Sequence, residues 1–390
     1  ISAVKAIVYI GQGGTEGGNA VADILTGAKT PSGKLVDTWA KQYQDFPSYD
    51  TFSYMNGDLE NEDYTEGIYV GYRYFETFDV EPLYPFGYGL SYTTFSYALK
   101  NYSIEGTQVT VKVEVKNTGS QYAGKEVIQL YVSKPGTRIE TEKIALCSFA
   151  KTKLLEPNEI SILTLGFDLK DIGVFDEAGA LWLLEKGEYT LLIGKDARAV
   201  EVSLALDIEE DIILEKVDSI APLNRVFEEL STQGKSTHVP AGDVPRLSVD
   251  AQAFTTVTYE YKDYTATPIA KVKEILPNLS TEDFVTLCVG AGQFDPLYNL
   301  TPGVAGSTTA SLLDKGVPNI TMSDGPAGLN VLTETVITPE GQQLYLKEIP
   351  ASNNYGFIRD TAPFSVGIPE SGRPIYQYMT AWPAVVNQAQ

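Results

Sequence analysis

One aspartate, close to a short apolar segment in the C-terminal part of the chain, is the candidate for contact with a ligand. A strand is predicted at residues 319–322, and Ser323-Asp324-Gly325-Pro326 forms its end. In a (β/α) barrel, the side chains that touch the ligand lie at the carboxyl ends of the strands. The position of Asp324 therefore predicts a ligand-contacting carboxylate.

A second carboxylate, Glu16, lies in the glycine-rich sequence GQGGTEGG at residues 11–18. Glycine-rich turns at helix starts can bind phosphate, but this one lacks the lysine of a P-loop and the complete pattern of a dinucleotide motif. Nucleotide binding is therefore disfavoured. We interpret Glu16 as a cap for the backbone amides of the following helix rather than as a functional carboxylate.

Three further polar residues have structural explanations. Glu66 and Arg73 are predicted to form an ion pair that fixes a loop, and not to take part in catalysis. His238 is the single histidine of the chain and occurs in the sequence STHVP. It is predicted to be an exposed linker residue rather than a ligand. No cofactor and no metal site is predicted.

The two cysteines are predicted to be free thiols. Cys147 and Cys288 are far apart in the sequence and each has apolar neighbours. Two buried thiols therefore fit better than a disulfide. Because reduced cysteines favour a reducing compartment, the chain is predicted to be cytoplasmic, with secretion as the alternative.

The composition indicates a globular protein with more than one domain. The 390 residues include 29 basic and 51 acidic side chains, which gives a formal net charge of −22. This charge repels nucleic acids and anionic lipids, so neither is a predicted partner, although acidity that serves only solubility is an equal explanation. No apolar run approaches the roughly 20 residues of a membrane helix. A neutral ligand fits best.

The first third of the chain predicts elements of an α/β domain. Residues 4–10 are apolar and predict a buried strand, while residues 19–25 have helical spacing and Gly27 as the C′ residue. Residues 66–95 are rich in aromatic side chains and glycine, which predicts an irregular segment between packed units. The abrupt first and last residues predict a chain that is cut at both ends.

A strict period of two begins near residue 97 and continues to about residue 206. On the segment before the turn Asn117-Thr-Gly119, valines alternate with polar residues. Further strands are predicted at residues 126–132, 160–167, 188–194 and 200–206. This pattern predicts an antiparallel β-sandwich of the immunoglobulin or fibronectin type III class, with a packing role. Residues 207–273 predict a linker with a short helix at 221–230.

The last part of the chain predicts alternating helices and strands. A helix begins at Ser280, where Asp283 completes a capping box, and it ends at Gly290. A second helix is predicted at residues 307–313. The turn Lys315-Gly316-Val317-Pro318 then leads into the strand that carries Asp324.

Three groups of motifs resemble glycoside hydrolase family 3, the β-glucosidase family. GQGGTEGGNAVADILTGAKTPSGKL, with EGIYVGYRYFE and PLYPFGYGLSYTTF, is similar to the distal half of the family's α/β sandwich domain. VKNTG, AGKEVIQLYV and LLEKGEYTLLIG are similar to its fibronectin type III-like domain. ITMSDGPAGLN is similar to the first strand of its catalytic barrel. The resemblance covers nearly the whole chain.

The resemblance implies a multidomain fold, α/β plus all-β. Residues 1–96 correspond to the distal part of the α/β sandwich domain, and residues 97–206 to the fibronectin type III-like β-sandwich. Residues 207–273 are the linker, and residues 274–390 correspond to the beginning of the (β/α)8 barrel. Because the barrel usually comes first, the chain is similar to a rearranged branch of the family, and it is predicted to be partial.

The resemblance also implies retaining hydrolysis of terminal β-D-glucosyl or related residues, with two carboxyl groups roughly 5 Å apart. The family's nucleophile, in a Ser-Asp-Trp motif, and its acid/base glutamate have no clear counterpart here, so no catalytic residue is assigned. Asp324 matches the aspartate of the family's DGP motif, which binds sugar hydroxyls. Asn330 stands where the family often has arginine, so that neighbouring contact is not carried over.

Two function classes are consistent with these observations. The first is a part of a β-glycosidase that acts on a small oligosaccharide or glucoside and is completed by the remaining part of the enzyme or a homodimer partner. The second is a non-catalytic carbohydrate-binding or interaction module. The release of nitrophenol from an aryl β-glucoside distinguishes them. The 390 residues alone are expected to be inactive or nearly so.

Overall fold

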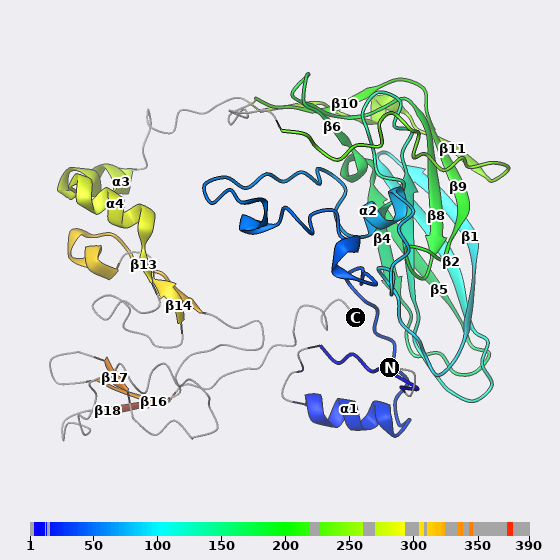
Figure 1. Cartoon of the computed structure of the whole chain (residues 1–390), viewed down its shortest axis with the longest axis horizontal. Coiled ribbons are helices and arrows are strands. Elements are labelled where there is room, and N and C mark those ends of the chain that lie inside the picture. Colours follow the sequence, from blue (N-terminus) through cyan, green and yellow to red (C-terminus); the bar gives the residue numbers. More distant parts are fainter. Residues whose placement is uncertain are drawn as a thin grey trace. The chain divides into compact units, whose positions relative to one another are not determined.

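The computed structural model of the chain describes residues 4–11, 13, 16–218, 227–259, 270–292, 304–307, 310–323, 334–337, 343–345 and 373–376. The chain divides into two compact units. One is Ala22–Tyr261, and the other combines Ile1–Val21 with Lys262–Ala389. Each unit has its own sheets (Figure 1). Among the described helices, none is long and apolar enough to cross a membrane.

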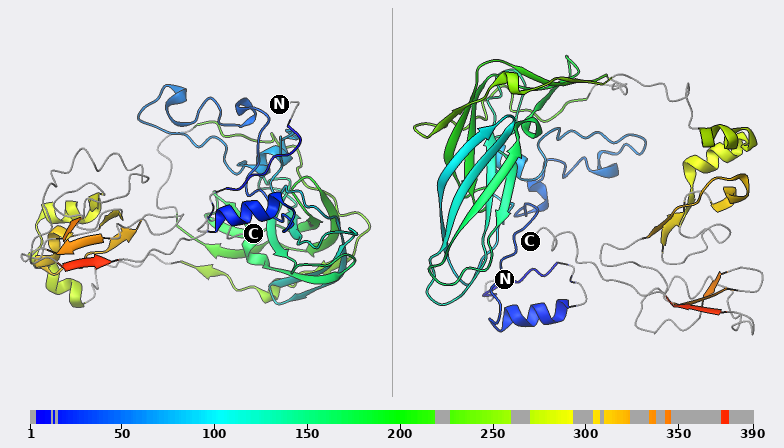
Figure 2. Two further views of the ribbon diagram at one scale, coloured as in Figure 1. Left: turned by 90° about the horizontal axis from the view of Figure 1, so that it is seen from below. Right: turned by 180° about the vertical axis from the view of Figure 1, so that it is seen from behind.

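The unit Ala22–Tyr261 is built on two sheets that share one core. One sheet has the strand order β1-β2-β5 and is antiparallel. The other has the order β11-β9-β8-β3-β4, in which β11 runs parallel to β9. Figure 2 shows both sheets from two further directions. The strands are β1 Phe95–Glu105, β2 Gln108–Asn117, β3 Val127–Ser133, β4 Ala145–Lys151, β5 Ile160–Asp168, β8 Gly187–Gly194, β9 Val200–Ile208 and β11 Arg246–Ser248.

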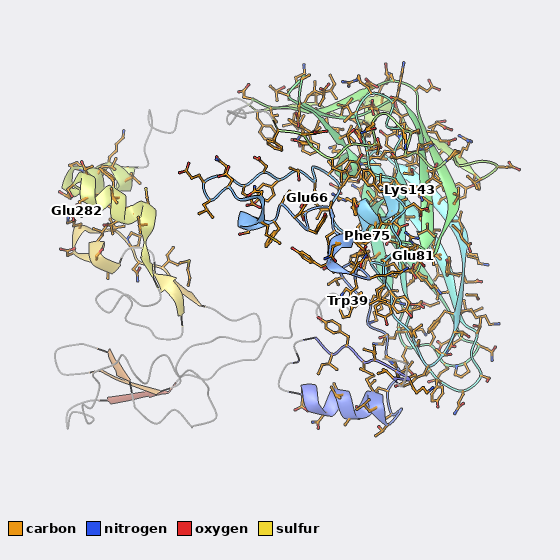
Figure 3. All side chains as sticks on the ribbon, viewed as in Figure 1. Trp39, Glu66, Phe75, Glu81, Lys143 and Glu282 are labelled. Carbon is orange, nitrogen blue, oxygen red and sulfur yellow. The ribbon has the colours of Figure 1, made fainter. Side chains whose placement is uncertain are left out.

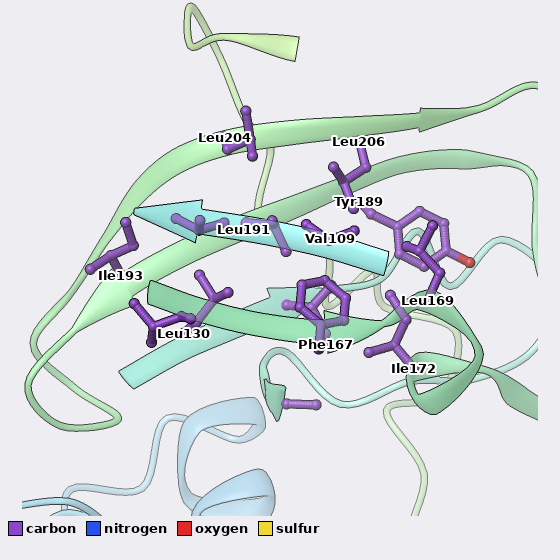
Figure 4. Packing of buried hydrophobic residues seen from close by; sticks show 14 of the residues in the cluster. Val109, Leu130, Phe167, Leu169, Ile172, Tyr189, Leu191, Ile193, Leu204 and Leu206 are labelled. Carbon is purple, nitrogen blue, oxygen red and sulfur yellow. The ribbon is translucent and has the colours of Figure 1, made fainter. Parts of the chain in front are cut away.

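The alternation of apolar and polar residues determines which side chains form this core. Successive side chains of a strand point to opposite faces, and the four valines of β2 are at most 1% exposed. Phe167 of one sheet and Leu130 and Leu191 of the other belong to the same buried cluster (Figure 4). The predicted antiparallel β-sandwich is confirmed, and its predicted strands begin or end within two residues of the observed ones.

A third sheet, of order β12-β10-β7-β6, belongs to the same unit. Its strands are β6 Val174–Asp176, β7 Leu181–Leu184, β10 Ile212–Lys216 and β12 Val257–Thr258, and the 3-10 helix η3 (Leu169–Ile172) precedes β6. Residues 207–273, predicted as a linker, therefore contain β10, β11, β12 and the 3-10 helix η4 (Ala251–Ala253). Their apolar residues Ile212 and Leu214 lie in the sandwich core. Most of the helix predicted at 221–230 lies outside the described residues.

The aromatic segment, residues 66–95, belongs to the same unit and includes the short helix α2 (Tyr72–Thr77), which the sequence pattern did not predict. Two 3-10 helices precede it, η1 (Tyr43–Asp45) and η2 (Ser53–Asn56). An isolated bridge joins Trp39 to Tyr84. Figure 3 labels Trp39, Glu66 and Phe75 on this part of the chain. Phe75 is fully buried, so the segment contributes to a packed interior.

The N-terminal residues differ from the prediction. Residues 4–10 form no strand, and Ile7 is 67% exposed. A strand needs partners for its N–H and C=O groups, and no described strand pairs with this segment. The predicted buried strand is therefore wrong for the described chain. The predicted helix is confirmed as α1 (Gly17–Leu25), and Gly27 has φ +77°, the left-handed conformation that commonly follows a helix end.

The second unit contains short helices and antiparallel strand pairs. In the order β13-β14-β15, β14 pairs antiparallel with both neighbours, and in β17-β16-β18, β16 does the same. The helices are α3 Ala270–Ile275, η5 Leu276–Asn278, α4 Thr281–Val289 and η6 Ala310–Lys315. The strands are β13 Ala291–Gly292, β14 Val304–Ser307, β15 Thr321–Ser323, β16 Glu334–Ile337, β17 Gln343–Tyr345 and β18 Arg373–Tyr376.

The sequence predicted α4 correctly but only part of the next helix. Ser280 and Asp283 form the capping box, and Gly290, with φ +71°, ends the helix. The helix predicted at residues 307–313 is partly wrong, because Ser307 ends β14 and the observed helix is the 3-10 helix η6. Short 3-10 segments of this kind are common as connectors between other elements.

Both cysteines are free thiols, but their environments differ. Cys147 is half-buried, its Sγ donates to the carbonyl of Leu130 at 3.2 Å, and burial raises the pKa of its thiol. Cys288 is exposed, so the predicted second buried thiol is wrong. Its neighbours on α4 are also exposed, Val285 by 57% and Val289 by 78%, which shows that apolar neighbours in sequence did not imply burial.

Candidate functional site

Asp324 and Asn330 lie outside the residues that the structure describes. The structure does describe the segment that leads to Asp324, since β15 ends at Ser323. Thr321 of β15 lies opposite Ser307 of β14 in an antiparallel pair. A barrel of the predicted type has parallel strands, and the pair of β14 and β15 is antiparallel. The described strands therefore do not show the barrel start predicted at residues 274–390, which stays a prediction.

An ion pair fixes the turn that precedes β15. Lys315 donates from Nζ to both carboxylate oxygens of Asp283 at 2.6 Å. Asp283 also accepts from the N–H of Ser280 at 2.6 Å, within the capping box. The Lys315 ammonium, followed by the Ser280 N–H, lowers the pKa of Asp283 to about 2. The pair therefore couples the start of α4 to the turn that precedes β15.

We expect Lys315→Ala to raise the pKa of Asp283 from about 2 toward its ordinary value, about 3.9. In the unchanged chain, Asp283 binds its proton less tightly when folded. Its stabilising contribution is therefore complete above about pH 4 and is lost as the pH falls toward 2. Carboxyl NMR titration measures the change. Lys273→Ala, at an exposed lysine of α3, is the control and should leave the pKa of Asp283 unchanged. If Lys315→Ala also leaves the pKa of Asp283 unchanged, this explanation is wrong.

A pocket of about 360 Å³ in the unit Ala22–Tyr261 is formed by residues 48–66, which end where the aromatic segment begins. Hydroxyl, carboxylate and aromatic side chains form its wall, and we call it the acidic pocket. Phe52 is 63% exposed and Tyr64 is 78% exposed. The lining residues are Ser48, Thr51, Phe52, Ser53, Glu62, Asp63, Tyr64 and Glu66.

Hydrogen bonds within the loop give the acidic pocket its shape. Ser53 has φ +58°, a left-handed conformation that few residues other than glycine adopt. The Glu62 carboxylate accepts a hydrogen bond from the Ser53 N–H at 2.8 Å, which stabilises this conformation. Phe46, just before the pocket, packs edge-on against Phe75 of α2, with ring centroids 5.7 Å apart. The loop is thus connected to the buried part of the aromatic segment.

The acidic pocket suits a small, neutral molecule that carries many hydroxyl groups. Carboxylates accept hydrogen bonds from hydroxyl donors, exposed aromatic rings bury apolar surface, and three acidic residues repel anions. Within the described ranges, no three His, Cys, Asp or Glu side chains are grouped so that they could hold a metal ion. The pocket was not predicted from the sequence. Its signal was the recurrence of aromatic and hydroxyl residues among acids in SYDTFSYMNGDLENEDYTE.

The aromatic segment is docked on the sandwich through tyrosine and glycine. The ring of Tyr72 lies 4.9 Å from Phe86 and 5.9 Å from Tyr131 of β3. Its hydroxyl accepts a hydrogen bond from the Leu146 N–H of β4 at 2.8 Å. At Gly87, φ +83°, an added Cβ would lie 2.3 Å from the side-chain nitrogen Nε2 of Gln129. Only glycine fits this contact.

A buried carboxylate joins α2 to the loop after β8. Glu76 is 7% exposed, and its Oε1 accepts from Nε of Arg198 at 2.9 Å. Arg198 also donates from Nη2 to the carbonyl of Val80 at 2.7 Å. Burial raises the pKa of Glu76, and the Arg198 guanidinium opposes that rise. The Arg198 side chain thus contacts the last turn of α2 and the residues that follow it.

The predicted pair of Glu66 and Arg73 is wrong. Nε of Arg73 lies 3.9 Å from Oε1 of Glu142, so the arginine faces the sandwich rather than its own loop. The hydroxyl of Tyr69 donates to Glu140 at 2.6 Å, and Glu140 also accepts from Ser231 at 2.8 Å. Burial, together with the Glu140 carboxylate, raises the pKa of Tyr69. Contacts distant in sequence hold this segment, which a local pattern does not reveal.

His238 is not an exposed linker residue, as predicted, but is half-buried. Its Nδ1 lies 3.1 Å from the carbonyl of Lys134, and its Nε2 lies 3.2 Å from Glu188. The Ala241 N–H, with Arg246 and His238, holds the pKa of Glu188 at about 2. These contacts hold the chain after residue 227 against the sandwich, so they explain His238 without a ligand.

Glu16 precedes α1 but caps it differently from the prediction. Its backbone carbonyl accepts from the Ala20 N–H at 3.0 Å, and its carboxylate accepts from the side-chain amide of Asn19 at 2.5 Å. The carboxylate thus bonds to a side chain of the first turn, where a bond to backbone amides was expected. Glu16 therefore stabilises this turn through Asn19.

Two family profiles match this chain. Residues 1–92 match the "Glycosyl hydrolase family 3 C-terminal domain", and residues 126–197 match the "Fibronectin type III-like domain". A β-glucosidase of Ruminococcus albus is 35% identical over 86% of this chain and 37% of its own length. β-Glucosidase A of Butyrivibrio fibrisolvens is 33% identical over 85% of this chain and 45% of its own length.

The crystal structure of a β-glucosidase from Paenibacillus barengoltzii is similar to this chain. It superposes with a TM-score of 0.63 and 34% sequence identity, over 80% of this chain and 37% of that chain. This chain thus spans less than half the length of each of these three relatives.

Proposed function

Because this chain belongs to glycoside hydrolase family 3, we propose that it is part of a retaining β-glycosidase. The enzyme removes terminal β-D-glucosyl or related residues from oligosaccharides or glucosides. One observation carries the proposal: β-glucosidases are 33–35% identical to this chain over 85–86% of its residues. An identity that extends through both profile-matched domains supports a shared chemistry more strongly than a shared fold does.

In the retaining mechanism, a carboxylate attacks the anomeric carbon and a second carboxyl protonates the leaving oxygen. Water then hydrolyses the glycosyl-enzyme intermediate. We place both carboxyl groups in parts of the enzyme other than these 390 residues. The chain supplies the distal α/β sandwich domain at residues 1–96, the fibronectin type III-like domain at 97–206, the connection 207–273 and the beginning of the (β/α)8 barrel at 274–390.

Asp324 is the proposed sugar-binding residue of the chain. Its ionised carboxylate can accept hydrogen bonds from two hydroxyls of the non-reducing sugar at once. Because the ion pair of Asp283 and Lys315 fixes the turn before β15, it acts as a positioning contact for Asp324. The substrate is uncharged, which agrees with a chain of net charge −22.

The remaining part of the enzyme, or a second copy of the chain, is the proposed partner. Nucleic acids and membranes are not proposed partners, since the net charge disfavours both. We place the enzyme in the cytoplasm, because both cysteines are free thiols.

Hydrolysis of 4-nitrophenyl β-D-glucoside by the complete protein tests the proposal. We expect release of nitrophenol, with the β-anomer of glucose as the first product in proton NMR spectra, since retention follows from two successive displacements. The α-anomer as first product refutes the retaining mechanism. A complete protein without any glycosidase activity refutes the proposed function.

The acidic pocket favours a second candidate function, sugar binding without turnover. Its volume of about 360 Å³ and its acidic and aromatic lining are suited to a small polyol. Calorimetry that detects glucose or cellobiose binding to a complete protein that releases no nitrophenol supports this candidate and excludes the first.

A further inference from the structure

A row of side chains crosses the third sheet of the unit Ala22–Tyr261. Phe175 on β6 lies opposite Trp182 on β7, Trp182 lies opposite Glu215 on β10, and Glu215 lies opposite Val257 on β12. Residues directly opposite each other in a sheet point to the same face. The four side chains therefore form one line, the Trp182 row, about 14 Å long at a strand spacing of about 4.8 Å.

The apolar members of the Trp182 row are exposed to solvent. Phe175 is 37% exposed, Trp182 is 42% exposed and Val257 is 43% exposed. Leu184, on the same face of β7, is fully buried in the sandwich core. The row thus lies where this face leaves the core. The rings of Phe175 and Trp182 are adjacent, with centroids 5.2 Å apart, and such an exposed aromatic pair is typical of a binding surface.

Polar groups converge beside the indole ring of Trp182. A pocket of about 120 Å³ opens there, and its wall is formed by Lys170, Trp182, Leu214, Glu215, Thr255 and Val257. Lys170 supplies an ammonium donor, Glu215 a carboxylate acceptor and Thr255 a hydroxyl that can donate or accept. In the described part of the chain, neither the Lys170 ammonium nor the Glu215 carboxylate forms a salt bridge.

We propose that the Trp182 row binds an uncharged oligosaccharide. The apolar faces of sugar rings can pack on the rings of Trp182 and Phe175, while sugar hydroxyls exchange hydrogen bonds with Lys170 and Glu215. The charges of these two residues cancel, and the net charge of −22 repels anions. A neutral ligand with apolar faces and hydroxyl edges is the complementary chemistry. The choice of β-linked glucose units rests on the proposed function.

Calorimetry of the 390-residue chain with cellotetraose, a β-linked glucose tetramer, tests this site. We expect measurable binding that Trp182→Ala weakens roughly tenfold or more, because the variant removes the largest stacking surface of the row. Glu215→Gln should weaken it less. Phe149→Ala is the matched control, since Phe149 is an aromatic residue 54% exposed on β4, outside the row, and it should bind like the parent.

Three results overturn the proposal. They are equal affinities of the parent and Trp182→Ala, no binding by the parent, or a dimer in sedimentation that Trp182→Ala abolishes, which would make the row a contact between copies. If Trp182→Ala fails to fold, as judged by near-UV circular dichroism, Trp182→Phe and Glu215→Gln replace it. Weaker binding by Glu215→Gln then supports the site, and unchanged binding by both overturns it.

The outcomes for the row and for the proposed hydrolysis can be separated. If the complete protein hydrolyses an aryl β-glucoside but the chain does not bind cellotetraose, only the proposal for the Trp182 row is overturned. Suppose instead that the chain binds cellotetraose in a way that depends on Trp182, but the complete protein has no glycosidase activity. That result overturns the proposed hydrolysis and leaves the proposed role of the Trp182 row intact.

Discussion

Asp324→Ala in the complete enzyme is expected to lower kcat/KM for an aryl β-glucoside by roughly 10²- to 10⁴-fold. Each hydrogen bond from a sugar hydroxyl to an ionised carboxylate contributes about 1.5–3 kcal/mol, and the proposed contact has two. Their loss totals about 3–6 kcal/mol, which corresponds to this range of rates. Steady-state kinetics with 4-nitrophenyl β-D-glucoside measures the effect.

Two control variants make the Asp324 result specific. Asp314→Ala removes an exposed aspartate of η6 in the same unit, and its kcat/KM should stay near that of the parent. Asp324→Asn keeps one oxygen acceptor, so its loss should be smaller than that of Asp324→Ala. If Asp324→Ala hydrolyses the glucoside like the parent, Asp324 does not bind the sugar.

Arg198→Ala is expected to lower the free energy of unfolding of the unit Ala22–Tyr261 by roughly 2–3 kcal/mol, because it leaves the Glu76 carboxylate buried without its closest cation. The parent has a 2.9 Å contact between Nε of Arg198 and Glu76 and a second hydrogen bond to the Val80 carbonyl. Urea unfolding followed by tryptophan fluorescence measures the loss.

The pH dependence identifies the cause of this loss. Burial already raises the pKa of Glu76 in the presence of Arg198, so the folded state binds this proton more tightly than the unfolded state. Stability therefore falls as the pH rises through the folded pKa. The deficit of Arg198→Ala should shrink at acidic pH, where Glu76 is protonated. Lys153→Ala breaks the exposed pair with Glu159 and should change the free energy of unfolding little. An equal loss of stability in both variants argues against burial as the cause.

The sandwich could be predicted from the sequence because its signal is local. The alternation of valines on β2 specifies both a strand and its buried face. The capping box of Ser280 and Asp283 and the glycine at position 290 are local signals in the same sense, and all of them are confirmed.

The other features depend on residues that are distant in sequence. His238 is half-buried because its two ring nitrogens lie against the carbonyl of Lys134, after β3, and the carboxylate of Glu188 on β8. Residues 4–10 have an apolar composition that suits a buried strand, but no described strand pairs with them. Cys288 likewise has apolar neighbours that are themselves exposed. Composition predicts a preference for burial, and only tertiary pairing decides whether burial occurs.

Neither the acidic pocket nor the Trp182 row was predicted, for the same reason. Phe175 and Trp182 are adjacent only through the register of β6 and β7, and Glu215 joins them through β10. The acidic pocket needs the left-handed conformation of Ser53, which the Glu62 carboxylate stabilises from nine residues away. Asp324 was predicted from a motif, and its position lies outside the described residues.

The most direct test of the proposed division of the active site is turnover of 4-nitrophenyl β-D-glucoside. The purified 390-residue chain is assayed alone and after co-expression with the polypeptide from the rest of its reading frame. We expect no measurable nitrophenol from the chain alone and steady release after co-expression, because we propose that both catalytic carboxyl groups of the retaining mechanism belong to other parts of the enzyme. Steady turnover by the chain alone, at a rate that co-expression does not raise, contradicts this division of the site.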